Sequence, residues 1–578
     1  MTHVDVRFPY QDATLPVDQR VEDLLARMDV KDKAGLLFQP MAQIGDFDEP
    51  GLFGKLPLRS LLERRINHFN ILFVPSAREI AQWHNAVQEQ ALQYPLGIPV
   101  TISSDPRHSF TNNPAMALLA GPFSQWPEPL GLAAVGSEEL VEQFADVTRR
   151  EYLAVGIRTA LHPQLDLATE PRWARTFGTF GADAGLVTRL GVAYVRGLQG
   201  EQVGPHSVSA MAKHFPGGGP QKDGEDPHFP YGREQVYPGG HFDLHLEPFK
   251  AAIAAGVSQI MPYYGFPVGT DYEEVGFSFN KGIVTGLLRE QLGFDGIVCT
   301  DWGILSHTYW GVEQLSHEER MIKALNAGID QFGGEDDAYT LFTLIADGTV
   351  SEKRIDTSVR RLLREKFRLG LFEEPFVDAG QADTLVGGPE ARAAGLAAQA
   401  AAHTLLRNAE DGPARLPLRG SPRLYVEGLS TAAIGDRAQV VDTPDQADVA
   451  VLRLVAPWEQ RGEPGTYETF FHAGSLAFPA AEMARIRAIC RTTPTVLDVY
   501  LERPAILADV ADDAASLIAN FGASEEAFVQ VLFGEAEPQG QLPFDIPSSM
   551  AAVEASHSDA PFDTADPTFR FGFGLRYA

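Results

Sequence analysis

Short apolar runs alternate with amphipathic segments over residues 1–372, and this alternation constrains the fold more than any other feature. A helical pattern with Val21, Leu24, Leu25 and Met28 on one face comes first. Apolar runs separated by helices are typical of βαβ units and a parallel sheet. About eight such units predict an α/β fold of the (β/α)8 barrel type. The runs are Asn70–Val74, Ile98–Ile102, Thr159–Leu165, Ser207–Lys213, Ser258–Met261, Gly296–Thr300 and Gly328–Phe332, with helical patterns such as Asp243–Ala255 and Asn280–Gln291 between them.

A second α/β region follows a polar, glycine-containing stretch at Leu371–Gly388. An alanine-rich helix is predicted over Pro389–Ala402. After it, strands again alternate with helices, which predicts a second α/β sandwich domain. We therefore expect a barrel over 1–372, a linker over 373–389, a sandwich domain over 390–550, and a tail over 551–578 that packs back on the barrel. The predicted strands are Arg423–Val426, Asp448–Val455, Thr495–Tyr500 and Ser516–Asn520.

Composition narrows the kinds of partner. The formal net charge of −30 disfavours nucleic acid and anionic membranes as binding partners. No run of 18 apolar residues occurs, and the first residues show no signal-peptide pattern, so we expect a cytoplasmic protein. The two cysteines do not indicate a disulfide framework. No metal-binding or dinucleotide motif is present, so we expect neither a metal nor an organic cofactor.

Polar residues follow several predicted strands directly, at the barrel end where such folds carry their chemistry. Asp301 follows the run GIVCT, and Lys213 and His214 end another run before the loop PGGGP. Asp105 and Asp166 also follow strands. Two arginines, Arg172 and Arg175, flank a tryptophan in the next loop. Carboxylates with cationic donors at one rim favour a site for a hydroxyl-rich ligand.

Each of these residues also has a purely structural interpretation. An Asp after a strand often caps the next helix, which is the alternative for Asp301. Lys213 and His214 could belong to a salt-bridged strand end with a glycine-rich turn. A phosphate-binding loop is disfavoured at PGGGP because the GK[ST] signature is missing.

The motifs together resemble those of the two-domain glycoside hydrolases of family 3, of the β-glucosidase type, over nearly the whole chain. RVEDLLARM is similar to the family's opening helix and EPRWARTFGTFGAD to its DPRWGR-type loop. AKHFPGGG is similar to its KHF motif, and GFDGIVCTDWG to the stretch that bears its nucleophilic Asp. RRLLREKFRLGLFEEPFV resembles the end of the family's first domain. VLFGEAEPQGQLPFDIP and FRFGFGL resemble its second-domain and C-terminal signatures, in the same order.

This resemblance implies hydrolysis of terminal β-D-glucosyl residues with retention, through a covalent intermediate on Asp301. Trp302 is expected to form an apolar wall of the site, and Tyr264 is expected to lie near the nucleophile. The chain departs from the family after the KHF motif, where Glu225, Asp226 and His228 are expected to line the site. The residues implied to bind the sugar in the −1 subsite are Asp105, Arg175, Lys213 and His214, and we add Asp166 and Arg172 as candidate substrate-binding residues.

The acid/base is expected in the second domain, in the loop after VAVLRLV. Glu459 lies closest to that strand, and Glu463 and Glu468 are the alternatives. Other functions remain open: a β-N-acetylglucosaminidase using Asp226 and His228, a β-xylosidase, or a catalytically silent sugar-binding protein. The expected partner is a small carbohydrate or glycoside, and self-association as a homodimer remains open.

Overall fold

The first domain is a closed barrel of parallel strands, which confirms the predicted fold class. The computed structural model describes residues 8–111 and 120–577. Seven strands form one sheet in the order β10-β8-β6-β5-β4-β3-β2, and β1 pairs with β11. The barrel strands are β1 (Phe38–Gln39), β2 (Met41–Ala42), β3 (His68–Ile71), β4 (Thr101–Ser104), β5 (Ile157–Ala160), β6 (Ser209–Phe215), β8 (Gln259–Pro262), β10 (Ile297–Val298) and β11 (Phe332–Gly333).

Pro40 divides the first barrel strand into β1 and β2. Proline has no N–H to donate to a ladder, but the carbonyl of Pro40 still accepts a hydrogen bond from the Asn70 N–H at 2.9 Å. A parallel bridge between Cys299 and Gln331 joins β10 to β11 and closes the ring. The sequence pattern does not predict this first strand, because its two halves are only two residues long.

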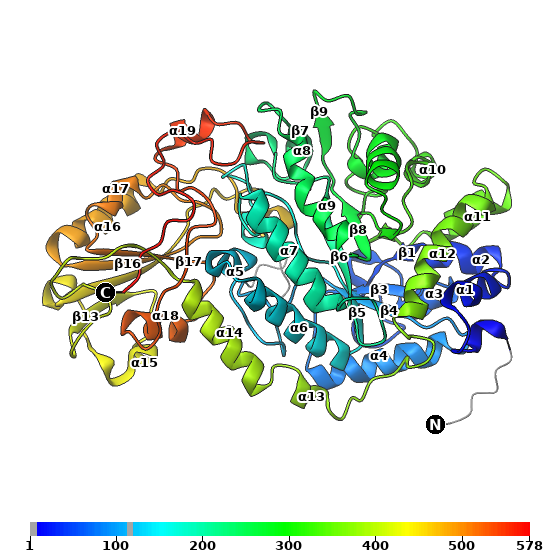
Figure 1. The fold of residues 1–578 in the computed structure, drawn as a ribbon, viewed down its shortest axis with the longest axis horizontal. Coiled ribbons are helices and arrows are strands. Elements are labelled where there is room, and N and C mark those ends of the chain that lie inside the picture. Colours follow the sequence, from blue (N-terminus) through cyan, green and yellow to red (C-terminus); the bar gives the residue numbers. More distant parts are fainter. Residues whose placement is uncertain (1–7, 112–119, 578) are drawn as a thin grey trace.

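Helices cover the outside of the barrel (Figure 1). Helix α12 shows why they form: Ile355, Val359 and Leu362 recur at helical spacing and are all fully buried. The predicted helix 280–291 is a π-helix over Gly282–Gln291. The barrel-domain helices are α1 (Val17–Leu25), α2 (Val30–Leu36), α3 (Leu58–Glu63), α4 (Ala77–Ala91), α5 (Pro129–Val135), α6 (Glu138–Ala154), α7 (Ala184–Gln199), α8 (Phe242–His245), α9 (Glu247–Ala254), α10 (His317–Ala327), α11 (Ala338–Ala346) and α12 (Glu352–Arg368). No helix among the described residues is long and apolar enough to cross a membrane.

The second domain is built on a six-stranded sheet in the order β12-β17-β16-β15-β13-β14, with β12 antiparallel to the rest. Alternate side chains of β15 and β16 point to opposite faces, so that Leu452 and Leu497 join one apolar cluster while Val451 and Val496 join another. Its strands are β12 (Thr404–Arg407), β13 (Arg423–Glu427), β14 (Gln439–Val440), β15 (Val449–Val455), β16 (Thr495–Tyr500) and β17 (Ser516–Asn520), and its helices include α14 (Pro389–Ala402), α16 (Ala480–Thr492) and α18 (Glu525–Leu532).

One face of this sheet packs against barrel loops that follow the carboxyl ends of β4 and β5. Leu130 of α5 and Phe177, which follow β4 and β5 in the chain, share a cluster with Leu497 and Leu517 of the sheet. Arg503, fully buried, donates to the carbonyl of Arg172 in the barrel and to several carbonyls of the second domain. The second domain therefore lies against the barrel rim where the predicted site residues emerge (Figure 1).

The segments outside the two cores contact both domains. The expected linker contains helix α13 (Ala382–Leu385), whose Asp383 pairs with Arg78 of α4. After helix α19 (Met550–Glu554), the chain first touches the barrel, where Thr169 donates to the carbonyl of Ser558. Its end returns to the second domain, because the edge strand β12 offers free backbone groups and Leu575 pairs with it. The tail thus divides between the domains, rather than packing on the barrel along its whole length.

Glu128, at the domain contact, should make stability depend on pH. Its carboxyl is fully buried, accepts from the Thr111 N–H at 2.7 Å and the Tyr500 hydroxyl at 3.2 Å, and burial raises its pKa to about 8. The fold therefore favours the protonated acid, and its stabilisation, complete below the ordinary pKa, is lost as pH rises towards about 8. We expect the Tm of the wild type to fall relative to that of Glu128→Gln between pH 5 and 9. The exposed substitution Glu139→Gln is the control, and its Tm difference from the wild type should not depend on pH. A Tm difference between the wild type and Glu128→Gln that is equally independent of pH would contradict the prediction.

Candidate active site

Parallel strands bring side chains from the ends of four strands together at one rim of the barrel. Asp105 directly follows β4, and Asp166 lies in the segment after β5. Lys213 and His214 lie in β6, and Asp301 lies just after β10. Because every barrel strand runs in the same direction, their carboxyl ends meet on one side. The structure therefore brings these predicted residues into one network, which the contacts below define.

Asp301 has one free carboxylate oxygen. The Trp302 N–H donates to its Oδ1 at 2.8 Å, while Oδ2 has no hydrogen-bond partner among the described residues. Oδ2 lies 3.7 Å from Nε2 of His214, and the residue is only 7% exposed. A buried carboxylate oxygen without a donor is costly unless a ligand meets it, so Asp301 is not merely a helix cap.

His214 is held as a single neutral tautomer. Its Nδ1 lies 2.7 Å from Oδ2 of Asp166, and NH1 of Arg175 donates to its Nε2 at 3.0 Å. Arginine cannot accept a hydrogen bond, so Nε2 is unprotonated and Nδ1 carries the proton. Burial, reinforced by the charge of Arg175, lowers the pKa of His214 well below its ordinary value. Burial raises the pKa of Asp166 to about 6 even though the N–H groups of His214 and Gly218 donate to it.

Asp105 and Lys213 form a second charged pair beside this network. Lys213 Nζ donates to Asp105 Oδ1 at 3.0 Å, and Asn70 Nδ2 lies 3.4 Å from Oδ2. Burial alone would raise the pKa of Asp105, but Lys213, Arg175 and Asn70 outweigh it and lower the pKa. A carboxylate and an ammonium side by side accept from and donate to neighbouring hydroxyls, as a sugar would require.

Tyr264 and Trp302 flank Asp301. The Tyr264 hydroxyl donates to the carbonyl of Trp302 at 2.8 Å, so it fixes the residue next to Asp301. The Trp302 ring lies on Gly333 and Gly334, where a Cβ would come within 2.6–2.7 Å of it. Its Nε1 is buried and has no hydrogen-bond partner among the described residues.

Asp226 and His228 form a pair next to these residues. Nδ1 of His228 lies 2.6 Å from Asp226 Oδ1, and Asp226 Oδ2 accepts from Trp173 Nε1 at 3.1 Å. Burial would raise the pKa of Asp226, but the charge and hydrogen bonds of His228 and the charge of Arg175 lower it. The His228 ring packs 4.5 Å from that of Tyr264. On its other side are two rings of the second domain, those of Phe471 at 4.9 Å and Tyr467 at 5.9 Å.

The three second-domain glutamates lie in one loop but face different partners. Glu459 bridges to Ala473, packs against Gly474, and its Oε2 lies 3.7 Å from Arg461. Glu468 accepts from the hydroxyl of Tyr231 in the barrel domain. Glu463 is exposed, and its carbonyl accepts from Thr466.

Two predicted substrate-binding residues make contacts within the protein instead. Arg172 is engaged by both carboxylate oxygens of Glu170, at 2.8 and 2.9 Å, and lies near Asp223. Glu225 Oε1 accepts from Arg461 of the second domain at 2.7 Å. Glu170 is only two residues from Arg172, but no sequence pattern shows that the two side chains pair; Arg461 is 236 residues from Glu225 in the chain.

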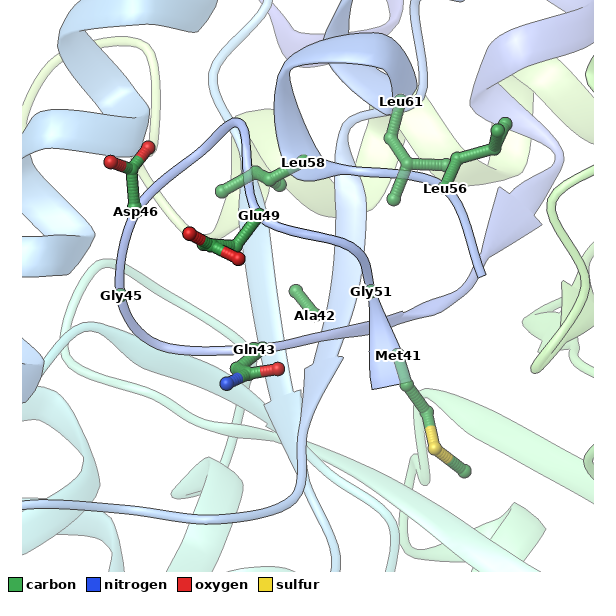
Figure 2. Close-up of a pocket in the computed structure, with 10 residues that line it drawn as sticks. All are labelled: Met41, Ala42, Gln43, Gly45, Asp46, Glu49, Gly51, Leu56, Leu58 and Leu61. Carbon is green, nitrogen blue, oxygen red and sulfur yellow. The ribbon is translucent and has the colours of Figure 1, made fainter. Parts of the chain in front are cut away.

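Neither a metal centre nor the hollow behind β2 is supported as a candidate site. No cluster of His, Cys, Asp or Glu in the described part of the chain could hold a metal ion. Figure 2 shows a hollow behind β2, lined by Gly45, Asp46, Glu49 and leucines. Its volume of about 40 Å³ is far below the ~300–1,000 Å³ of ligand pockets, and it contains none of the predicted residues.

Comparisons with known proteins cover both domains of the chain. Residues 69–365 match the glycosyl hydrolase family 3 N-terminal domain, and residues 343–577 match the family 3 C-terminal domain. The chain is 50% identical to Beta-glucosidase C of Emericella nidulans, covering 98% of this chain and 94% of that protein. It is 40% identical to the periplasmic beta-glucosidase/beta-xylosidase of Dickeya chrysanthemi, covering 98% and 91%.

Solved structures share the fold. A beta-glucosidase from Erythrobacter marinus has a TM-score of 0.81 at 21% identity, over 99% of this chain and 84% of that one. A beta-glucosidase from Listeria innocua in complex with isofagomine has a TM-score of 0.77 at 22% identity, over 97% and 83%.

Proposed function

The chain belongs to glycosyl hydrolase family 3, and we propose that it is a retaining β-glucosidase acting on terminal, non-reducing β-D-glucosyl residues. The observation that carries this proposal is Asp301 Oδ2, a buried oxygen without a donor beside Arg175 and His214. The curated relatives named as β-glucosidases match nearly the whole length of the chain.

The geometry supports a reaction in two displacements. In the first, Asp301 Oδ2 attacks the anomeric carbon and forms an ester, while the leaving oxygen takes a proton from a general acid. In the second displacement, the residue that served as the general acid now acts as a base. It removes a proton from water as that water attacks the anomeric carbon. Asp301 then leaves as a carboxylate, and the two inversions give net retention.

The sugar would be held by the charged pairs around Asp301. Asp105 accepts from hydroxyls, and Lys213 donates to them. The neutral His214 keeps Arg175 pointing at the site, so that a positive charge lies near Asp301 when the ester breaks. Trp302 offers its ring and its unpartnered Nε1. These contacts need neither a metal nor an organic cofactor.

For the acid/base we propose Glu459. Its loop follows β15 closely and is fixed at Ala473, and its carboxyl is about half exposed, which leaves it free to exchange protons. Its neighbour Arg461 reaches Glu225 of the barrel, so the loop meets the rim of the site. His228 is the second candidate, because its ring packs 4.5 Å from that of Tyr264, which contacts the Asp301–Trp302 segment.

Replacement of the nucleophile should stop the first displacement. Asp301→Asn keeps the shape and the hydrogen bond from Trp302 but removes the attacking charge. We expect kcat for an aryl β-glucoside to fall by at least about 10⁴-fold, with an unchanged Tm. Asp46→Asn, in the hollow behind β2, is the matched control. If Asp301→Asn retains more than about a tenth of the activity, Asp301 is not the nucleophile.

Loss of the acid/base should stall the second displacement. With a dinitrophenyl glucoside the leaving group needs no proton, so Glu459→Ala should still form the ester rapidly and then accumulate it. Azide, which needs no base, should then restore turnover and give a β-glucosyl azide. Glu463→Ala and Glu468→Ala are the matched controls from the same loop.

The same assay distinguishes the two candidates. If His228→Ala shows the stall and azide rescue while Glu459→Ala resembles the wild type, His228 is the acid/base. If neither variant stalls, both assignments are wrong. A parallel comparison with aryl β-xyloside and aryl N-acetyl-β-glucosaminide tests the sugar: wild-type turnover should be highest with the glucoside.

A further inference from the structure

The tail holds a short segment, Ser556–Thr564, against the barrel domain, and we name it the strap. Asp559 lies at its centre with a fully buried side chain. Its Oδ1 accepts from the Gly239 N–H at 2.7 Å and its Oδ2 from the His241 N–H at 2.8 Å. A buried carboxylate that takes two backbone donors from another domain fixes the position of that backbone.

The strap also accepts hydrogen bonds from two residues, His245 and Thr169, that lie beside the glycine loop Gly217–Gly219. We call these two residues the supports of that loop, which follows His214. The carbonyl of Asp559 accepts from His245 Nε2 at 3.0 Å, and the carbonyl of Ser558 accepts from the Thr169 hydroxyl at 2.6 Å. Burial lowers the pKa of His245 to about 4, so its ring is neutral and Nε2 carries the proton that it donates.

Both supports touch the glycine loop directly. A Cβ on Gly217 would lie 2.7 Å from the Cβ of His245, and a Cβ on Gly219 would lie 3.3 Å from the Thr169 hydroxyl. Between them, the Gly218 N–H donates to Asp166, the carboxylate that fixes the His214 tautomer. The loop has no side chains of its own with which to resist movement, so its position depends on these neighbours.

We propose that Asp559 is a positioning residue for His214, acting from the tail through the supports of the glycine loop and the Gly218–Asp166 hydrogen bond. The proposal rests on the proposed function, since it assigns the strap a role in glucoside turnover. In this role the tail positions an active-site residue without touching the substrate.

Asp559→Asn tests the proposal with little change of shape. The amide nitrogen must face one of two backbone N–H groups, so one hydrogen bond is lost. We expect faster hydrogen exchange at residues 214–221, with a fall in kcat/KM for an aryl β-glucoside of about tenfold. Asp566→Asn, exposed and just beyond the strap, removes the same charge and should match the wild type.

The pH profile separates positioning from a general loss of stability. The Gly218 N–H lowers the pKa of Asp166, so weakening this bond should move the acid limb of kcat/KM to higher pH by about half a unit. Asp166 also faces His214, Arg175, Tyr263 and His245, which the substitution leaves in place.

A second variant keeps the test decisive if Asp559→Asn does not fold. Thr169→Val removes the hydrogen bond to Ser558 and retains the side-chain shape, and it should give the same changes to a smaller degree. Unchanged exchange at residues 214–221, or an unchanged acid limb, in the folded variants would overturn the proposal. If the wild type does not hydrolyse the glucoside, the proposed function fails, while the exchange comparison still decides whether the strap holds the loop.

Discussion

The common direction of the barrel strands is the constraint on which the site depends. Parallel strands closed into a ring place the residues after β4, β5, β6 and β10 on one rim, although Asp105 and Asp301 are far apart in the chain. The second domain packs against the loops of that same rim, with Arg503 bonded to carbonyls of both domains. In the proposed mechanism the barrel supplies the nucleophile and the sugar contacts, and the second domain supplies the acid/base.

Among Asp105, Asp166 and Asp301, one carboxylate oxygen is left without a hydrogen-bond donor in the described part of the chain. Asp166 is occupied by His214 and Gly218, and Asp105 by Lys213 and Asn70. Arg175 is directed by the unprotonated Nε2 of His214. Asp301 Oδ2 alone among these carboxylate oxygens is buried without a hydrogen-bond partner in the described residues. That difference distinguishes Asp301, the proposed nucleophile, from Asp105, which is proposed to hold the sugar, and from Asp166, which orients His214.

The sequence predicted what depends on local pattern and strand ends. The barrel, the second sheet and the strand-end positions of Asp301, Lys213 and His214 follow from apolar runs and what comes after them. It did not predict contacts made by distant segments, such as the pairing of Glu225 with Arg461 or the approach of Tyr467 to His228. It also did not predict the local ion pair between Arg172 and Glu170, because no periodicity encodes the direction of these two side chains. The first strand was missed because Pro40 splits it. The acid/base depends on a loop whose path no periodicity encodes.

The most direct test of the account is to trap the covalent intermediate. A 2-deoxy-2-fluoro-β-glucoside with a dinitrophenyl leaving group forms the ester readily but slows its hydrolysis, because the fluorine destabilises the oxocarbenium-like transition state. Peptide mapping by mass spectrometry should then find one glycosyl group per chain, on the peptide that contains Asp301. An adduct on Asp105, Asp226 or another carboxylate, or normal turnover of a glucoside without any adduct, would contradict the account.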